Sequence, residues 1–338
     1  MLKWIMLRKL IALSLILIAT LNLSGCTFNQ GGGEFTTVYA ATTNGLTIYT
    51  NEGLKWRTLT QADGIAHSSI RRVFAHSLYG IYLATNLGLS ISRDEGISWT
   101  NINVTNAGTI TQVEDIAVHN FTICVATPNG LFISKNNGNS WTLKNADNGL
   151  SSNTVLGVAM SENNFYVATD GGVSISNDGG DTWSNVTVSN GLADNLVLDI
   201  SIDGSTIYAS GAYGMSFSKD NGARWTVVKK ANGLASDYIT SVTGQGSTIY
   251  VCTDQGLSIS HDNGATWTSK TKADGLGDDF VRRVTVRPTS TGMTIYAATF
   301  RGLSFSTDFG ATWHNSTVIQ GLGSNDVQDV AFVTIYIG

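Results

Sequence analysis

Short apolar runs alternate with polar turns along most of the chain, and they recur at a nearly constant interval. One unit covers residues 238–270, in which the runs 238–243, 248–253 and 257–260 are rich in β-branched, aromatic or alternating apolar residues and a fourth run begins at 266–270. Such runs are typical of strands. No segment shows a sustained apolar period of 3.6 residues, so each unit predicts four short antiparallel strands and almost no helix.

Each unit also carries a short box that ends in tryptophan. The box SHDNGATW at 260–267 has five close relatives and one degenerate relative, YTNEGLKW at 49–56. The tryptophans that end the seven boxes are spaced by 43, 42, 42, 42, 42 and 46 residues. Seven units of four strands at this spacing are typical of a propeller. We predict an all-β fold over residues 36–338: a seven-bladed β-propeller of four-stranded antiparallel blades.

The two ends of the repeat region indicate how the ring closes. Residues 37–40 align with the second strand of a unit and have no first strand before them, whereas residues 327–332 align with a first strand. We therefore expect the C-terminal strand to complete the first blade, which removes open edges that would invite aggregation. Residues 334–336 resemble another second strand. Whether they extend the last strand or are the remnant of a longer repeat stays open.

The N-terminal segment has the features of an export signal. Basic residues among the first nine precede an apolar run at 10–21, which is too short to span a membrane comfortably. The run ends in LSGC at 23–26, which resembles the lipobox read by bacterial lipoprotein signal peptidase. The resemblance implies that a lipid is attached to Cys26 and that the preceding segment is removed. The alternative is an ordinary signal peptide or anchor with a chance cysteine.

These features predict three segments: a lipoprotein signal peptide at 1–26, a flexible tether at 27–35 and the propeller at 36–338. Thr27 follows the cysteine at the position where Asp favours inner-membrane retention in well-studied enterobacteria. We therefore expect an exported protein, lipid-anchored in the bacterial envelope. The outer membrane, on its periplasmic side or at the surface, is favoured over the inner membrane.

Composition excludes several classes of function. The net charge of −5 and the absence of a basic block argue against a nucleic-acid partner. Cys124 and Cys252 fall three units apart, so two buried free thiols are expected rather than a disulfide. The histidines occupy different repeat positions, and neither a metal-ligand spacing nor a phosphate-binding glycine loop occurs. We predict no metal and no cofactor.

The boxes follow the pattern Ser-x-Asp-x-Gly-x-Thr-Trp and resemble the Asp-box (BNR) repeat. That repeat is found in sialidases, two-propeller xyloglucanases, sortilin-type receptors and the photosystem II assembly factor. The resemblance covers residues 36–333. It implies that each box lies on the hairpin between the third and fourth strands, at the blade periphery and away from any active centre.

The chemistry of the box agrees with a structural role. An Asp side chain can accept the backbone N–H groups of a short turn, Gly264 can adopt a positive φ, and Trp267 can cover the hairpin. One carboxylate per turn is too few for calcium, and Asn51 and Asn136 replace it in two boxes. The residues expected to act structurally are Asp94, Asp178, Asp220, Asp262, Asp308, Trp99, Trp141, Trp183, Trp225, Trp267 and Trp313.

Functional residues are expected where the copies differ. The third residue of the first strand changes around the ring and reads Arg72, Asp115, Gly157, Asp199, Ser241, Arg283 and Asp329. First strands line the central channel of a propeller, so a mixed Arg/Asp collar is expected at its mouth. The residues expected beside this collar on the same face are Arg71, Tyr213, Arg282, Phe300 and Arg301. Either the charges pair and seal the channel, or they bind an anion or acidic peptide.

Several observations argue against catalysis. The sialidase resemblance implies an Arg-Ile-Pro start and a tyrosine activated by a glutamate, but Arg-Ile-Pro does not occur and the few glutamates lie mostly in boxes and the tether. The connection from each box tryptophan to the next first strand is always 14 residues, without the elaborated loops of a pocket. Hydrolysis of a glycoside would need two carboxylates that face one sugar. Asp278 and Asp279 are the candidates, but adjacent carboxylates on a loop are more often simply solvated.

We therefore predict no catalytic residue and a non-catalytic, monomeric envelope lipoprotein. Its partners are expected to be the membrane, through the lipid, and a protein, peptide or glycan bound by the propeller. A glycoside hydrolase of the sialidase or xyloglucanase type acting on extracellular glycans is the main alternative. A purely structural envelope protein is the third.

Overall fold

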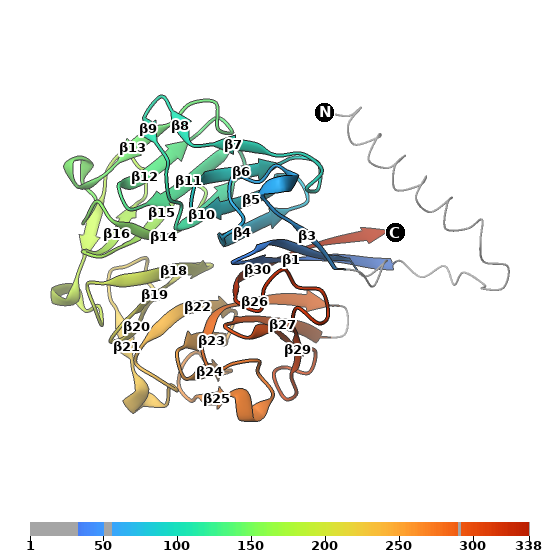
Figure 1. Ribbon diagram of the computed structural model, residues 1–338. Coiled ribbons are helices and arrows are strands. Elements are labelled where there is room, and N and C mark those ends of the chain that lie inside the picture. The colour runs from blue at the N-terminus through green and yellow to red at the C-terminus, as the bar shows by residue number, and fades with distance from the viewer. Residues whose placement is uncertain (1–32, 51–55, 290–291, 338) are drawn as a thin grey trace. The chain divides into compact units, whose positions relative to one another are not determined.

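The computed structural model describes residues 33–50, 56–289 and 292–337 (Figure 1). Within these ranges, Phe35–Ile335 forms one compact unit. The predicted signal peptide with Cys26, most of the tether and the centre of the first box lie outside the described residues. Among the described residues, none belongs to a helix that is both long enough and apolar enough to span a membrane.

The compact unit is a seven-bladed β-propeller, as predicted, and each blade is a four-stranded antiparallel sheet with strands A to D from inside to outside. The A strands of blades 1 to 7 are β30 (Val327–Ile337), β4 (Ile70–His76), β10 (Asp115–His119), β14 (Val155–Ser161), β18 (Val197–Asp203), β22 (Ile239–Gln245) and β26 (Val281–Thr289). The B strands are β1 (Gly33–Thr42), β5 (Gly80–Thr85), β11 (Thr122–Thr127), β15 (Asn164–Thr169), β19 (Thr206–Gly211), β23 (Thr248–Thr253) and β27 (Gly292–Thr299).

The outer two strands of the blades are shorter. The C strands are β2 (Gly45–Thr50), β6 (Gly88–Ser92), β12 (Gly130–Ser134), β16 (Gly172–Ser176), β20 (Gly214–Ser218), β24 (Gly256–Ser260) and β28 (Gly302–Ser306). The D strands are β3 (Trp56–Leu59), β7 (Thr100–Ile102), β13 (Thr142–Lys144), β17 (Ser184–Val186), β21 (Thr226–Val228), β25 (Thr268–Lys270) and β29 (His314–Ser316).

The core lies between adjacent blades. One buried cluster joins Leu131 and Ile133 of blade 3 to Phe165 and Val167 of blade 4. Both faces of a blade are covered by its neighbours, so C strands such as β6, β16 and β24 are buried throughout even though apolar residues and serines alternate along them. The buried serines accept hydrogen bonds from the neighbouring connection; Ser258 Oγ, for example, lies 2.9 Å from the Ala235 backbone N. Burial of polar side chains is tolerated here because the hydroxyls are bonded.

The ring closes as the sequence predicts, with β30 beside β1 in blade 1. Residues 334–336 extend strand A, because β30 continues to Ile337, and Thr334 Oγ1 lies 3.2 Å from Thr36 Oγ1. In blade 7, residues 287–289 pair with residues 292–294, which makes the hairpin of β26 and β27 longer than its equivalents. Cys124 and Cys252 are buried and free, as expected.

Most D–A connections contain one turn of 3-10 helix. These are η2 (Gln61–Asp63), η3 (Ala146–Asn148), η4 (Val188–Asn190), η5 (Lys230–Asn232) and η6 (Lys272–Asp274). The connection after blade 2 instead forms a small hairpin of β8 (Val104–Thr105) and β9 (Gly108–Thr109). The sequence showed no sign of this hairpin, because all D–A connections have the same length. Asn106 exchanges two hydrogen bonds with the backbone of Trp141, at 2.7 and 2.9 Å, and so ties the hairpin to blade 3.

Strand direction gives the propeller two faces. The A–B and C–D turns share one face, which we call the turn face; Asn137 of a C–D turn donates its backbone N–H to Phe121 O of an A–B turn at 2.7 Å. The B–C turns and D–A connections share the other face, the mouth face, where Phe300 N lies 3.3 Å from Phe280 O. Since β1 is a B strand, the chain enters the propeller from the turn face.

Candidate functional site

On the turn face, the box Asp is bound to its own hairpin. Asp262 Oδ1 accepts hydrogen bonds from Ser260 Oγ at 2.7 Å and from the Thr266 backbone N–H at 2.9 Å, and Asp262 Oδ2 accepts one from Thr266 Oγ1 at 2.6 Å. These bonds, those from Thr266 first, lower the pKa of Asp262 to about 2. The turn also relies on Gly264, whose φ of +90° is open to glycine and strained for a residue with a side chain.

Blade 3 provides a natural substitution of this carboxylate. Asn136 Oδ1 accepts from the Ser140 backbone N–H at 2.9 Å and from Ser134 Oγ at 3.0 Å, and Asn136 Nδ2 donates to Ser140 Oγ at 2.8 Å. The turn is the same, so it requires a side-chain oxygen and not a charge. Within the described ranges, no group of three His, Cys, Asp or Glu side chains is placed to hold a metal ion.

The box tryptophans fill space beside the hairpins. A Cβ added to Gly264 of the box would lie 3.5 Å from Trp267 Cζ2, and one added to Gly233 of the preceding D–A connection would lie 3.4 Å from Trp267 Cβ. The tryptophan side chain therefore spans from the turn to the connection. Trp141 and Trp313 are buried in the same position of their blades. These residues support the packing of neighbouring blades.

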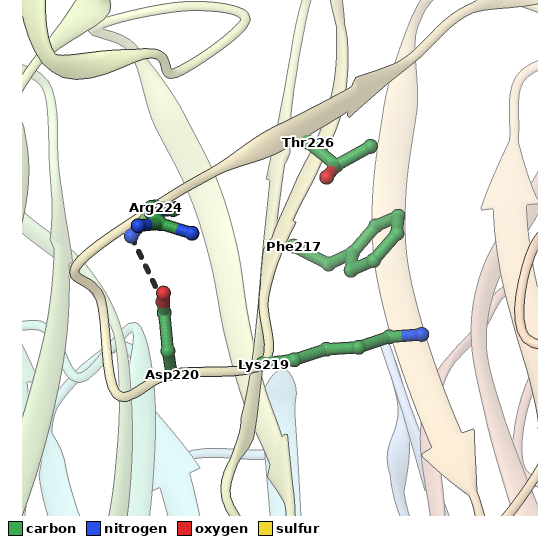
Figure 2. A pocket seen from close by; sticks show the side chains of 5 residues that line it. All are labelled: Phe217, Lys219, Asp220, Arg224 and Thr226. Carbon is green, nitrogen blue, oxygen red and sulfur yellow. Dashed lines mark hydrogen bonds between the residues drawn. The ribbon is translucent and has the colours of Figure 1, made fainter.

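Two shallow grooves lie beside the boxes. A groove of about 290 Å³ is lined by Phe217, Lys219, Asp220, Arg224 and Thr226 of blade 5, where Asp220 accepts from the Arg224 backbone N–H (Figure 2). A second groove, of about 250 Å³, is lined by the equivalent residues of blade 3 and by residues 179–181 of the next box. Because the same cavity recurs at the same repeat position, it belongs to the architecture of the blades rather than to a unique site.

The predicted collar residues come together at the centre of the ring. Arg72 Nε lies 3.3 Å from Asp115 Oδ1, and Arg72 Nη2 lies 3.5 Å from Asp199 Oδ1. Arg283 Nη2 lies 2.5 Å from the same Asp199 oxygen, and Arg283 Nε lies 3.6 Å from Asp329 Oδ1. We call these five residues the central Arg–Asp cluster. Asp199 is only 1% exposed, so the cluster is interior rather than at the surface of the mouth.

The cluster also ties successive blades together. Asp115 Oδ2 accepts the backbone N–H of Val158 in the next blade at 3.0 Å, and Asp329 Oδ2 accepts that of Val73 at 3.0 Å. Burial raises the pKa of Asp115 and that of Asp329, against the opposing effect of the arginines. Of the two arrangements that the sequence left open, the structure shows the one in which these charges pair with one another.

The charges of the cluster do not cancel. Three carboxylates face two guanidinium groups, which leaves one excess negative charge when all five are ionised. Asp199 Oδ2 and Ser241 Oγ are buried without a hydrogen-bond partner. With all five groups ionised, an anion brought to this cluster would meet net negative charge, so its arginines are poor candidates for anion binding.

The remaining predicted arginines lie at the mouth face and are also paired. Arg71 Nη1 lies 3.2 Å from Glu114 Oε2, Arg282 Nη2 lies 2.9 Å from Asp326 Oδ1, and Arg301 Nε lies 3.0 Å from Asp278 Oδ2. Each such pair is partly solvated, so it contributes little to stability. A ligand carboxylate would therefore compete with the internal partner.

Exposed aromatic rings gather on one side of the mouth face. Tyr213 of the blade 5 B–C turn is 66% exposed, Tyr238 before strand A of blade 6 is 41% exposed, and Phe300 of the blade 7 B–C turn is 51% exposed. Phe280, before strand A of blade 7, is half-buried. The Arg282 guanidinium lies over the Phe280 and Phe300 rings, 5.2 and 5.5 Å from their centroids. We call these four rings the aromatic arc.

The equivalent positions on the other side of the mouth face carry no aromatic residue. The B–C turn of blade 2 has an exposed Leu87 instead. Sequence reasoning found Tyr213 and Phe300 but missed Tyr238 and Phe280, because it compared the B–C turns and the third position of strand A. A comparison of the position immediately before strand A would have found them. In blades 1 to 4 this position is occupied by Asp326, Ser69, Gln112 and Thr154.

Comparisons with known proteins agree with the fold. A family model described as the DUF6242 beta propeller domain matches residues 118–234. No curated protein matches the chain. Among solved structures, the chain is similar to the extracellular domain of a putative hybrid two-component system from B. thetaiotaomicron, with 17% identity and a TM-score of 0.69 over 84% of this chain and 38% of that one.

Two further structures represent other uses of the fold. An ancestral GH74 enzyme is 17% identical, with a TM-score of 0.63 over 86% of this chain and 47% of the enzyme. YCF48 bound to D1 peptide is 14% identical, with a TM-score of 0.57 over 76% of this chain and 86% of that one. The chain thus spans less than half of the two-component-system structure and of the GH74 enzyme. Identities this low establish a shared fold and no shared activity.

Proposed function

We propose that this protein is a non-catalytic, lipid-anchored binding platform of the bacterial envelope, which binds a protein, peptide or glycan on its mouth face. The single observation that carries the proposal is the aromatic arc. Large rings are exposed on blades 5 to 7, whereas the equivalent positions of blades 1 to 4 carry no ring. Exposed clusters of Tyr, Phe and Arg are typical of binding surfaces, in which a few such residues supply most of the affinity.

The direction of the first strand supports the anchoring part of the proposal. β1 begins at Gly33 on the turn face and runs toward the mouth face. A lipid on Cys26 would therefore hold the propeller by its turn face. The proposed tether of 27–35 would leave the mouth face open to a ligand that is not in the membrane. The extracellular domain of the putative hybrid two-component system from B. thetaiotaomicron, which shares the fold, is a precedent for exposure outside the cytoplasm.

The carboxylates at the mouth do not favour a glycoside hydrolase. Asp278 is paired with Arg301, and Asp279 Oδ1 accepts the Lys272 backbone N–H at 2.6 Å. A general acid needs both a raised pKa and access to substrate. Asp115 and Asp329 have raised pKa values but are buried in the central Arg–Asp cluster. The binding role is therefore favoured over the hydrolytic one.

The binding proposal is tested with arrays of oligosaccharides and peptides probed with the purified propeller. We expect the propeller to bind at least one class of array member, and the double variant Tyr213→Ala/Phe300→Ala to lose that signal. We also expect no release of reducing sugar from any bound saccharide. Binding that survives the double substitution, or an array without any signal, would contradict the proposal.

The anchoring proposal is tested separately. Cells that express the full chain are labelled with a fatty-acid analogue, and the protein is separated into membrane and soluble fractions. We expect wild type to carry the label in the membrane fraction, and Cys26→Ser to be unlabelled. Equal labelling of both proteins, or no labelling of either, would show that Cys26 does not carry a lipid.

A further inference from the structure

We infer that the ligand of the aromatic arc is an uncharged saccharide chain. This inference rests on the proposed binding function and narrows it to one class of ligand. The mouth face offers three things to a ligand: aromatic rings, paired arginines and turn backbone. The exposure of the rings, the pairing of the arginines and the hydrogen bonding of the backbone decide which class of ligand fits.

The rings supply apolar, flat contact surfaces. Tyr213, Tyr238 and Phe300 are each exposed by two fifths or more of their surface, and they come from three successive blades. The face of an aromatic ring is apolar and carries partial negative charge, so it attracts the slightly positive C–H groups on the face of a sugar ring. Rings on consecutive blades suit an extended chain of such units better than one small molecule.

Three arginines of the mouth face are already paired. Arg71, Arg282 and Arg301 each lie within 3.2 Å of a carboxylate oxygen of this chain. An acidic ligand would have to compete with these internal carboxylates, and the central Arg–Asp cluster carries one excess negative charge when its five groups are ionised. The paired groups still present polar edges that can exchange hydrogen bonds with neutral hydroxyls. The pairing of these arginines therefore favours an uncharged, hydroxylated ligand.

The backbone of the mouth turns in blades 6 and 7 is largely occupied. In blade 6, Thr253 Oγ1 donates to Gly256 O at 2.8 Å and accepts from Gln255 N at 3.0 Å. In blade 7, Thr299 Oγ1 makes the same two bonds with Gly302 O and Arg301 N, at 2.7 and 3.3 Å. A peptide bound by strand addition gains much of its affinity from main-chain hydrogen bonds to a free edge. The described residues beside the arc belong to turns and connections and offer no such edge.

The ligand class is tested by isothermal titration calorimetry with hexasaccharides of glucose, xylose, mannose and N-acetylglucosamine as the uncharged probes. A galacturonic acid hexasaccharide and an Asp/Glu-rich peptide serve as the acidic probes. We expect at least one uncharged hexasaccharide to bind more tightly than either acidic probe. Its affinity should be nearly independent of salt between about 50 and 500 mM, because no charge is neutralised on binding.

Substitutions then place the ligand on the arc. We expect Tyr213→Ala and Phe300→Ala each to weaken binding by about tenfold or more, as is typical of aromatic contacts at the centre of a binding surface. Leu78→Ala is the matched control, because Leu78 is also a large exposed apolar side chain but lies in an A–B turn on the turn face. This control should bind as wild type does.

The possible outcomes distinguish failure of the saccharide inference from failure of the platform function. If only an acidic probe or a peptide binds and loses affinity in Tyr213→Ala, the platform function stands and the saccharide inference is wrong. If an uncharged hexasaccharide binds equally to wild type and to the arc variants, the inference is also wrong, because the ligand lies elsewhere. If none of the probes binds, the inference is overturned; an array that is also silent overturns the platform function with it.

Discussion

The turn face and the mouth face are built by the same repeat and differ in how their side chains are used. On the turn face, the box satisfies its own hairpin, so the Asp262 oxygens are occupied by Ser260 and Thr266. On the mouth face, the backbone repeats just as closely, but exposed rings occur on blades 5 to 7 and not at the matching positions of blades 1 to 4. A repeat position that meets a local structural need is uniform. A repeat position without a structural role can carry different residues in different blades, and some of these can contact a ligand.

The central Arg–Asp cluster belongs to neither face, and substitutions there should have the largest effect on the stability of the propeller. Arg283→Met would leave Asp199, Asp329 and Asp115 with a single guanidinium among them. We expect the free energy of unfolding to fall by about 3–5 kcal/mol, as for other broken buried ion pairs. Urea denaturation measures this loss.

The matched variant for that experiment is Asp199→Asn. It removes one of three carboxylates and leaves two charges of each sign, so it should cost clearly less than Arg283→Met. Equal losses for the two variants would show that the excess negative charge does not matter to the cluster.

The boxes should show a smaller, local effect. Asp262→Ala removes the acceptor of the Ser260 and Thr266 hydrogen bonds, and we expect a loss of stability that is measurable but clearly smaller than that of Arg283→Met, as when a helix cap is removed. Asp262→Asn should cost well under half of that, because Asn136 already builds the same turn in blade 3. Differential scanning calorimetry of both variants tests this. A penalty for Asn as large as that for Ala would mean that the charge itself is needed.

Lowering the pH should reduce the stability that the box carboxylates contribute and increase the stability that Asp115 and Asp329 of the central Arg–Asp cluster contribute. The pKa values of Asp262 and Asp308 are lowered to about 2 in the folded protein. The stability that they contribute is therefore present above the usual carboxyl pKa of about 4 and is lost as the pH falls through about 2. Asp115 and Asp329 have raised pKa values, so their contribution is present at low pH and is lost as the pH rises through those values.

The test compares urea midpoints at pH 5 and near pH 2 for wild type and for Asp262→Asn/Asp308→Asn. We expect the double variant to lose less stability on acidification than wild type does, because two of the groups that take up protons on unfolding have been removed. An identical acid dependence in the two proteins would show that the box carboxylates are not responsible.

The smallest effect on stability is expected at the mouth face. Tyr213→Ala and Phe300→Ala remove exposed side chains from turns, so each should change the free energy of unfolding by no more than about 0.5 kcal/mol. Thermal unfolding of the two variants checks this. A loss comparable to that of Arg283→Met would mean that the rings are structural, and would undermine their assignment to a ligand.

The sequence predicted the fold because every blade carries the same pattern of residues. Alternating apolar residues, turn glycines and the seven tryptophans recur at matching positions, so the number of blades and the closing strand β30 could be read directly. The hairpin of β8 and β9 was missed because it has the same length as the connections that it replaces. The pattern did not show that Asn106 would bind the Trp141 backbone.

The candidate site was only partly predictable. The residues of the central Arg–Asp cluster were found because they break the repeat at one strand position. Their mutual pairing depends on side-chain directions in a closed ring, which the sequence left open. Tyr238 and Phe280 lie one residue before strand A, and their exposure depends on how the D–A connections meet the mouth.

The central claim is that the aromatic arc, and not the turn face, is the binding surface, and one titration tests it most directly. Wild type, Tyr213→Ala and Leu78→Ala are titrated by calorimetry with the uncharged hexasaccharide that wild type binds best. We predict that Tyr213→Ala weakens binding by about tenfold or more, while Leu78→Ala matches wild type. Loss of binding in Leu78→Ala with an unchanged Tyr213→Ala would contradict the claim.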